Sequence, residues 1–180
     1  MLHVVLVFDE VSSGFRLNTG GAHLLYGVSP DVAVFAKAVS NGYPMACIIG
    51  TRQVMEAAQT TFISSTNWTE RIGPTAALAT IKKHRDQEVA GHLIRIGEMV
   101  QAGWRSAAEQ AGLGLEVGGI PPLAHFGFTC DSSQAAHTLF TQIMLQFGFL
   151  ASKGFYATYA HQDHHVEKYL TAVSKAFGEV

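Results

Sequence analysis

The chain has 180 residues, enough to bury a sizeable core in one domain or in two small ones. Hydrophobic residues make up 48% and charged residues 14%, which indicates a large core, a buried subunit interface, or both. The formal charge of −2 gives no electrostatic footprint for nucleic acid or for an anionic membrane, so we expect neither as a partner. Cys47 and Cys130 lie far apart and in no metal or redox spacing, which favours a reducing cytoplasm.

The beginning of the chain predicts a buried strand over residues 2–8, followed directly by Asp9 and Glu10. It has no basic leader and meets two acids early, so it is neither a signal peptide nor a membrane span. A strand that is apolar on both faces belongs inside a sheet covered on both sides, and this one has no lead-in. We therefore expect a truncation, an internal start or a split gene.

Two more strands and two helices follow in the first half. The strands are predicted over residues 31–36 and 45–49, and a short helix through residues 57–58 comes next. Pro74 suits the first position of an alanine-rich helix over residues 74–84. The basic cluster 82–85 is typical of a helix C-terminus, where cations complement the dipole.

The second half begins with the most regular helix of the sequence. Apolar residues recur at steps of three and four from Val89 to Ala111, and Gly112 follows as a stop. The remaining predicted elements are strands over 115–117 and 123–129, a helix over 133–147, a strand over 149–151, and a last helix with Val166, Leu170, Val173 and Phe177 on one face. We expect a domain boundary that separates residues 1–87, part of an α/β sheet, from residues 88–180, a compact α+β unit.

Lys37 and Asp9 are the two residues with the most chemical promise. Lys37 ends the second strand, where a lysine either extends its amine towards water or presents a desolvated amine that forms Schiff bases with carbonyl compounds. An apolar strand that ends in Asp9 and Glu10 also fits the Walker B segment of an ATPase, with both acids serving Mg²⁺. That alternative needs the motif G-x-x-x-x-G-K-S/T, which these residues lack. Together, a strand-end amine and a strand-end carboxylate suit pyridoxal phosphate, which needs an aldehyde partner and an anion beside its pyridine nitrogen.

Three segments carry a family resemblance: DEVSSGFR, YGVSPDVAVFAK and NGYPMACIIG. In this order they resemble the class III aminotransferases of pyridoxal-phosphate fold type I, most closely the glutamate-1-semialdehyde aminomutase branch. The likeness continues through WTERIGPTAALATI to the closing AHQDHHVEKYLTAVSKAF. It implies the C-terminal part of a mainly parallel-sheet large domain, followed by a small α+β C-terminal domain.

The resemblance also implies roles for individual residues. Lys37 would hold pyridoxal phosphate as a Schiff base and move the substrate proton, Asp9 would pair with the pyridinium nitrogen, and Val11 would contact the ring. Thr69, with Thr66 as second choice, would bind the cofactor phosphate of a neighbouring subunit. A helix cap or turn hydroxyl is the alternative for Thr69.

The expected activity is transfer or intramolecular shift of an amino group on a small amine or amino acid. The family resemblance implies a cytoplasmic homodimer with shared active sites, and this chain would be part of a longer or split enzyme. An inactive remnant or a regulatory partner of the same fold is the alternative. No arginine follows Arg105, so a carboxylate clamp from this chain would come from Arg16 or Arg71.

Other residues receive weaker predictions. We expect Glu10 to make a structural hydrogen bond or an ion pair with Arg16, and we assign no chemistry to residues 12–14. His161 and His165 have the spacing of a helical metal pair, but a solvated helix start that includes His164 and Asp163 is favoured. His125 and Tyr156 either line a substrate pocket or are structural, and Trp68 is expected at a subunit interface.

Overall fold

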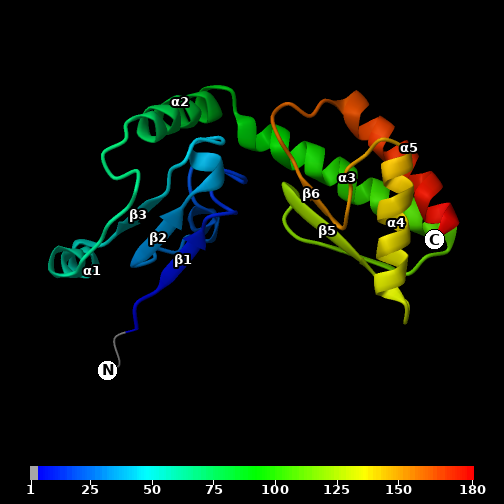
Figure 1. Ribbon diagram of the computed structural model, residues 1–180, viewed down its shortest axis with the longest axis horizontal. Helices are drawn as coiled ribbons and strands as arrows, with labels where there is room; N and C mark the ends of the chain where they lie inside the picture. The colour runs from blue at the N-terminus through cyan, green and yellow to red at the C-terminus, as the bar shows by residue number, and fades with distance from the viewer. Residues whose placement is uncertain (1–3) are drawn as a thin grey trace. The chain divides into compact units, whose positions relative to one another are not determined.

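In the computed structural model, which describes residues 4–180, the chain divides into two compact units (Figure 1). The first ends at Gly91 and the second spans His92–Val180, so the division falls within helix α3 (Val89–Ala111). The domain boundary expected after residue 87 stays a prediction about the whole protein.

The first unit is built on a three-stranded sheet of order β1-β2-β3. Strand β1 (Val7–Glu10) runs parallel to β2 (Val32–Phe35), and β3 (Cys47–Gly50) runs antiparallel to β2. The strand predicted over residues 2–8 is thus shorter and later, and residues 2 and 3 lie outside the described residues.

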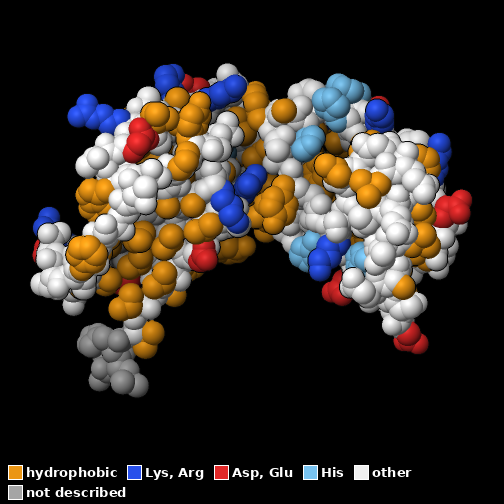
Figure 2. All heavy atoms as spheres, in the orientation of Figure 1, with side chains coloured by type: hydrophobic (Ala, Val, Ile, Leu, Met, Phe, Trp, Pro, Cys, Tyr) orange, Lys and Arg blue, Asp and Glu red, His pale blue; other side chains and the backbone are white. Residues whose placement is uncertain are grey.

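Only one face of this sheet is covered within residues 4–180. The register places Phe8, Glu10, Ala33 and Phe35 on the covered face, where Phe15 of the following loop and Ala77 of α2 complete the core. On the other face, Val7 is 55% and Ile48 58% exposed, and hydrophobic side chains gather on the surface of this unit (Figure 2). No described segment packs on the second face, so the expectation of a sheet covered on both sides stays a prediction about a longer protein.

Short helices and one long helix connect and follow the strands. They are η1 (Ala22–Tyr26), η2 (Lys37–Val39), α1 (Arg52–Met55), η3 (Glu56–Thr60) and α2 (Ile72–Asp86). Helix α2 begins two residues before Pro74, because the Glu70 carboxylate accepts the N–H groups of Ile72 and Gly73 at 2.9 and 3.3 Å. Its last turn is basic as predicted, but His84 is buried and is not a surface cation.

The second unit places three helices with an antiparallel sheet of order β4-β5-β6. Its elements are α3, β4 (Leu115–Gly118), β5 (Leu123–Phe128), α4 (Ser133–Gln146), β6 (Gly154–Tyr156) and α5 (Asp163–Glu179). Aromatic rings fill its core: the ring centroid of Phe126 lies 4.9 Å from Trp104, 5.3 Å from Phe140 and 5.6 Å from Phe177.

The periodicity of α3 is confirmed, since Leu93, Ile96, Val100 and Trp104 are all buried, and Gly112 ends the helix at φ +68°. The strand predicted over residues 149–151 is wrong. The backbone instead pairs with β5 from Lys153 onward, whose carbonyl accepts the N–H of Phe126 at 2.9 Å.

Candidate active site

The ends of β1 and β2 bring Asp9 and Lys37 to one edge of the first sheet. The two strands are parallel and pair Asp9 with Val34 and Glu10 with Phe35, so their carboxyl ends coincide. Lys37 follows two residues after Phe35 and opens η2. Side chains alternate along a strand, which sends Asp9 to the uncovered face and Glu10 to the covered one.

The Asp9 carboxylate is exposed and available to a partner. Its Oδ1 accepts the N–H of Val11 at 3.0 Å, a local turn that fixes the orientation of the side chain. No ion pair found among residues 4–180 includes Asp9. Val11 itself is half-buried beside this carboxylate.

Lys37 stands in a backbone conformation that lysine rarely adopts. Its φ is +50°, which costs a non-glycine residue about 1–3 kcal/mol and is often found at functional sites. Its Nζ donates a hydrogen bond to Ser12 Oγ, 2.5 Å away, across the ends of the two strands. The amine is exposed, so residues 4–180 do not provide the burial that the alternative of a desolvated amine requires.

Thr69 lies in an exposed turn that precedes α2. The helix is capped by the Glu70 carboxylate and not by the Thr69 hydroxyl. The role predicted for Thr69, and for Thr66 in the same turn, concerns a neighbouring subunit and stays a prediction. Trp68 is 67% exposed, and its place at a subunit interface likewise stays a prediction.

Glu10 is a structural residue, but its partner is His23. The side chain is 1% exposed; Oε1 accepts the backbone N–H and the ring Nδ1–H of His23, both at 3.0 Å, and Oε2 accepts the hydroxyl of Ser13. Burial acts to raise the pKa of Glu10, but the hydrogen bonds from Ser13 and His23 outweigh burial and lower it. The expected structural hydrogen bond is thus confirmed. Arg16 Nε donates to the carbonyl of Ser12 at 3.3 Å, and its pairing with Glu10 stays a prediction.

A second buried group, His84 of α2, holds the loop that follows β1. Its Nε2 donates to the carbonyl of Phe15 at 3.0 Å, and its Nδ1 accepts the hydroxyl of Thr19 at 2.8 Å. Burial lowers the pKa of His84 and so favours the neutral imidazole, whose Nδ1 accepts the Thr19 hydroxyl. This role could not be predicted from the sequence, because His84 lies within a run of basic residues.

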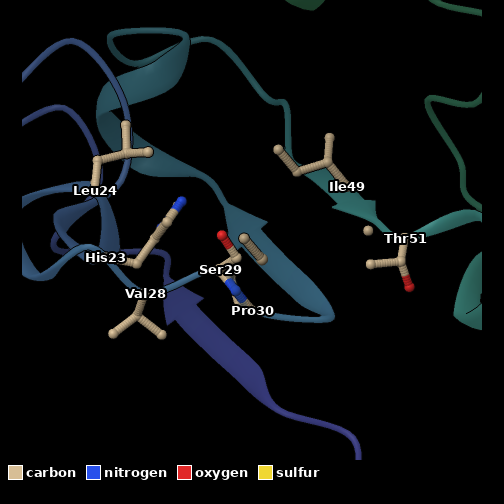
Figure 3. A pocket seen from close by; sticks show the side chains of 9 residues that line it. His23, Leu24, Val28, Ser29, Pro30, Ile49 and Thr51 are labelled. Carbon is tan, nitrogen blue, oxygen red and sulfur yellow. The ribbon is translucent and has the colours of Figure 1, made fainter.

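An open cavity of about 340 Å³ lies near the start of β2 and the end of β3, away from the strand ends that precede Lys37 (Figure 3). It is lined by His23, Ala33, Ile49 and Thr51, among others, and thus sits beside the start of β2 and the end of the antiparallel β3. The cavity is therefore separate from the edge that carries Asp9 and Lys37.

His161 and His165 of the second unit have structural roles. His161 Nδ1 accepts the N–H of Thr158, and His165 Nδ1 accepts the N–H of Gln162 in a capping box, both at 3.0 Å. No cluster that could hold a metal ion occurs in the described part of the chain. The favoured interpretation as a helix start is confirmed, and Asp163 pairs there with Arg95 at 2.7 Å.

His125 and Tyr156 lie on the outer face of the second sheet. Leu123 pairs with Tyr156, and His125, two residues further, therefore shares that face. Both side chains are exposed, and their placement in a substrate pocket stays a prediction.

A carboxylate and an amine on adjacent parallel strand ends suit pyridoxal phosphate, and the comparisons identify the family of the chain. Residues 2–177 match the family Aminotransferase class-III, so the chain belongs to the class III aminotransferases. Residues 4–180 contain no helix with both the length and the apolarity needed to cross a bilayer.

Relatives include both aminotransferases and aminomutases. The chain is 30% identical to the 3-aminobutyryl-CoA aminotransferase of Cloacimonas acidaminovorans over 99% of its own length and 44% of that protein. It is 32% identical to the glutamate-1-semialdehyde 2,1-aminomutase of Desulforudis audaxviator, over 96% of this chain and 44% of that one.

Among solved structures, the pyridoxal-phosphate form of the FumI protein of Sphingopyxis sp. matches 98% of the chain and 43% of its own, with a TM-score of 0.92 and 25% identity. An omega-transaminase from Sphaerobacter thermophilus shares the fold with a TM-score of 0.86, over 97% of this chain and 44% of its own, at 21% identity. The fold class is thereby confirmed, and pyridoxal phosphate is the cofactor of the family. The chain spans somewhat less than half the length of these relatives.

Proposed function

We propose that the chain supplies Lys37 and Asp9 to the active site of an enzyme that transfers or shifts an amino group with pyridoxal phosphate. The observation that supports this most directly is that Asp9 and Lys37 lie at the same edge of the sheet, with the Lys37 backbone at φ +50°. Family membership supports the same chemistry.

The residues present fit the cofactor. An exposed carboxylate suits a cationic ring nitrogen, an exposed amine suits an aldehyde, and the half-buried Val11 offers apolar contact to a ring. When bound, pyridoxal phosphate supplies an electron sink for breaking bonds at the substrate carbon that bears the amine.

The chain's own side chains would then act as follows. Lys37 Nζ holds the cofactor, and as a free amine it takes and returns the proton of the amine-bearing substrate carbon. Asp9 orients the ring and stabilises its positive charge through a charge-assisted hydrogen bond. The turn at Val11 keeps the carboxylate in place through the N–H bond to Oδ1.

We propose further that the active form contains more polypeptide than these residues, as a longer or split enzyme that forms a homodimer. The uncovered sheet face supports this, since Val7 is 55% and Ile48 58% exposed, and so does the coverage of less than half of each relative. The substrate would be a small amine or amino acid. Two free cysteines, Cys47 and Cys130, support a cytoplasmic setting.

The Walker B alternative loses its second acid. Glu10 is buried, and its two carboxylate oxygens are committed to His23 and Ser13, so it does not face a water on a magnesium ion. An inactive remnant would retain Lys37 without forming a bond to the cofactor, and the following experiment separates that alternative.

The test is borohydride reduction in the presence of pyridoxal phosphate, followed by peptide mapping. The reduction is applied to the chain alone and to the chain mixed with the N-terminal portion of the Cloacimonas acidaminovorans relative. Lys37→Arg is the matched control. We expect the pyridoxyl group on Lys37, more strongly in the mixture, and none at that position in the control. Label on other lysines alone, in both samples, would contradict the proposal.

A further inference from the structure

Ser12 is the side chain that meets the Lys37 amine. Its Oγ lies 2.5 Å from Lys37 Nζ, although 25 residues separate the two in the sequence. Ser12 is half-buried, whereas the amine that it holds is exposed. The contact joins the loop after β1 to the residue that follows β2, so it bridges the edge at which Asp9 also stands.

The loop around Ser12 is held firmly. The carbonyl of Ser12 accepts Arg16 Nε at 3.3 Å, and the next residue, Ser13, donates its hydroxyl to the buried Glu10. Gly14 N donates to the carbonyl of Glu10 at 2.9 Å, and a Cβ at Gly14 would come within 2.7 Å of that same carbonyl. The backbone at Ser12 is therefore held in one position by its neighbours in the loop.

Phe15 and Lys37, the two residues with positive φ that belong to or contact the loop around Ser12, are both held by hydrogen bonds of that loop. Phe15 has φ +59° and is buried, with its N–H bonded to Gly20 and its carbonyl to His84. Lys37 has φ +50° and reaches back to the same loop. Strain of this kind persists only where surrounding contacts impose it.

We propose that Ser12 is a positioning residue for Lys37. The Ser12 hydroxyl holds Lys37 Nζ at the strand edge whenever the amine is free. This rests on the proposed function of Lys37. A hydroxyl both donates and accepts, so it bonds a protonated amine through its oxygen and a neutral amine through its hydrogen. It therefore suits a lysine that takes and returns a proton, because the contact survives both states.

The first test follows Lys37 without the cofactor. Reductive methylation with formaldehyde and cyanoborohydride is timed at each lysine by peptide mapping, with exposed Lys153 as the internal reference. The hydrogen bond to Ser12 competes with the reaction at the amine, so Ser12→Ala should speed methylation of Lys37 about tenfold relative to Lys153, a factor that corresponds to about 1.4 kcal/mol. Ser12→Thr keeps the hydroxyl and should restore the slow rate.

Ser13→Ala is the matched control, since it removes a neighbouring half-buried hydroxyl and loosens the loop but leaves Ser12. It should leave the Lys37 rate within about twofold of the original, because the Ser12 hydroxyl remains. An equal rate in Ser12→Ala and the original chain, or an equal rise in Ser13→Ala, would overturn the proposal.

The second test uses pyridoxal phosphate and borohydride on the same proteins. Formaldehyde reaches the amine in any position, whereas pyridoxal phosphate held at the strand edge requires the amine to stay there. Ser12→Ala should therefore shift the label from Lys37 towards other lysines, and Ser12→Thr should reverse the shift. Label on Lys37 that is unchanged in Ser12→Ala contradicts the role of Ser12 alone. Absence of Lys37 label in the original chain, with a normal methylation result, contradicts the proposed function and leaves Ser12 as the partner of Lys37.

Discussion

Replacing His84 with phenylalanine keeps an aromatic ring in the core of the first unit but removes both ring nitrogens. The side chain is 6% exposed and makes bonds of 3.0 Å to the carbonyl of Phe15 and 2.8 Å to the hydroxyl of Thr19. A buried carbonyl left without its donor costs about 1–3 kcal/mol, and the lost bond to the exposed Thr19 about 0.5–1.5 kcal/mol. We expect the free energy of unfolding to fall by about 2–4 kcal/mol.

The pH dependence provides a second measure of the same contact. Burial lowers the pKa of His84 from its ordinary value of 6.5, so the unfolded chain binds the proton first as the pH falls. The contribution of His84 to stability is therefore complete above that ordinary value and is lost as the pH falls through the folded-state pKa. His84→Phe removes this part of the acid sensitivity.

Urea unfolding of the original chain, His84→Phe and Thr19→Ala at about pH 8 and about pH 5 measures both effects. Thr19→Ala, which loses only the second bond, should cost about 0.5–1.5 kcal/mol. A free energy of unfolding for His84→Phe within about 0.5 kcal/mol of the original would refute this account of the loop, since surface substitutions typically change stability by no more than that.

Three further predictions concern buried or reactive groups. Tyr169→Phe leaves the buried Trp104 N–H without its acceptor at 3.0 Å and should cost about 1–3 kcal/mol in thermal unfolding of the second unit. Burial raises the pKa of Tyr169 to about 12 from 10.0, so the original chain should lose stability as the pH rises through that interval; equal alkaline profiles for both proteins would contradict this. Glu10→Gln should cost about 1.5–3 kcal/mol in urea unfolding because it weakens the buried hydrogen bonds that the carboxylate accepts from His23 and Ser13, and a cost below about 0.5 kcal/mol would show that the charge is dispensable. Asp9→Asn should leave stability within about 0.5 kcal/mol, because the side chain is exposed, but weaken pyridoxal phosphate binding about tenfold or more by fluorescence titration; unchanged binding would exclude Asp9 as the ring partner.

Patterns that depend on local periodicity were predictable. The apolar repeat of α3 is confirmed from Val89 to Ala111, and so are the parallel strand ends that carry Asp9 and Lys37. These features follow from steps of three and four in a helix and from the order of residues at the ends of strands.

Features that depend on distant partners were not predictable. Glu10 bonds His23, 13 residues further along the chain, because the loop folds back over the covered face. His84 sits among surface cations in the sequence, yet its ring enters the core. Ser12 gave no chemical signal of its own, since its role arises only when β1 and β2 align their ends.

A crystal structure of the chain grown with pyridoxal phosphate, alone or with the N-terminal portion of a relative, tests the central claim most directly. The account predicts electron density that continues from Lys37 Nζ into the cofactor, with the Asp9 carboxylate within hydrogen-bond distance of the ring nitrogen. A cofactor bound elsewhere, or attached to another lysine while Lys37 stays free, would contradict the account.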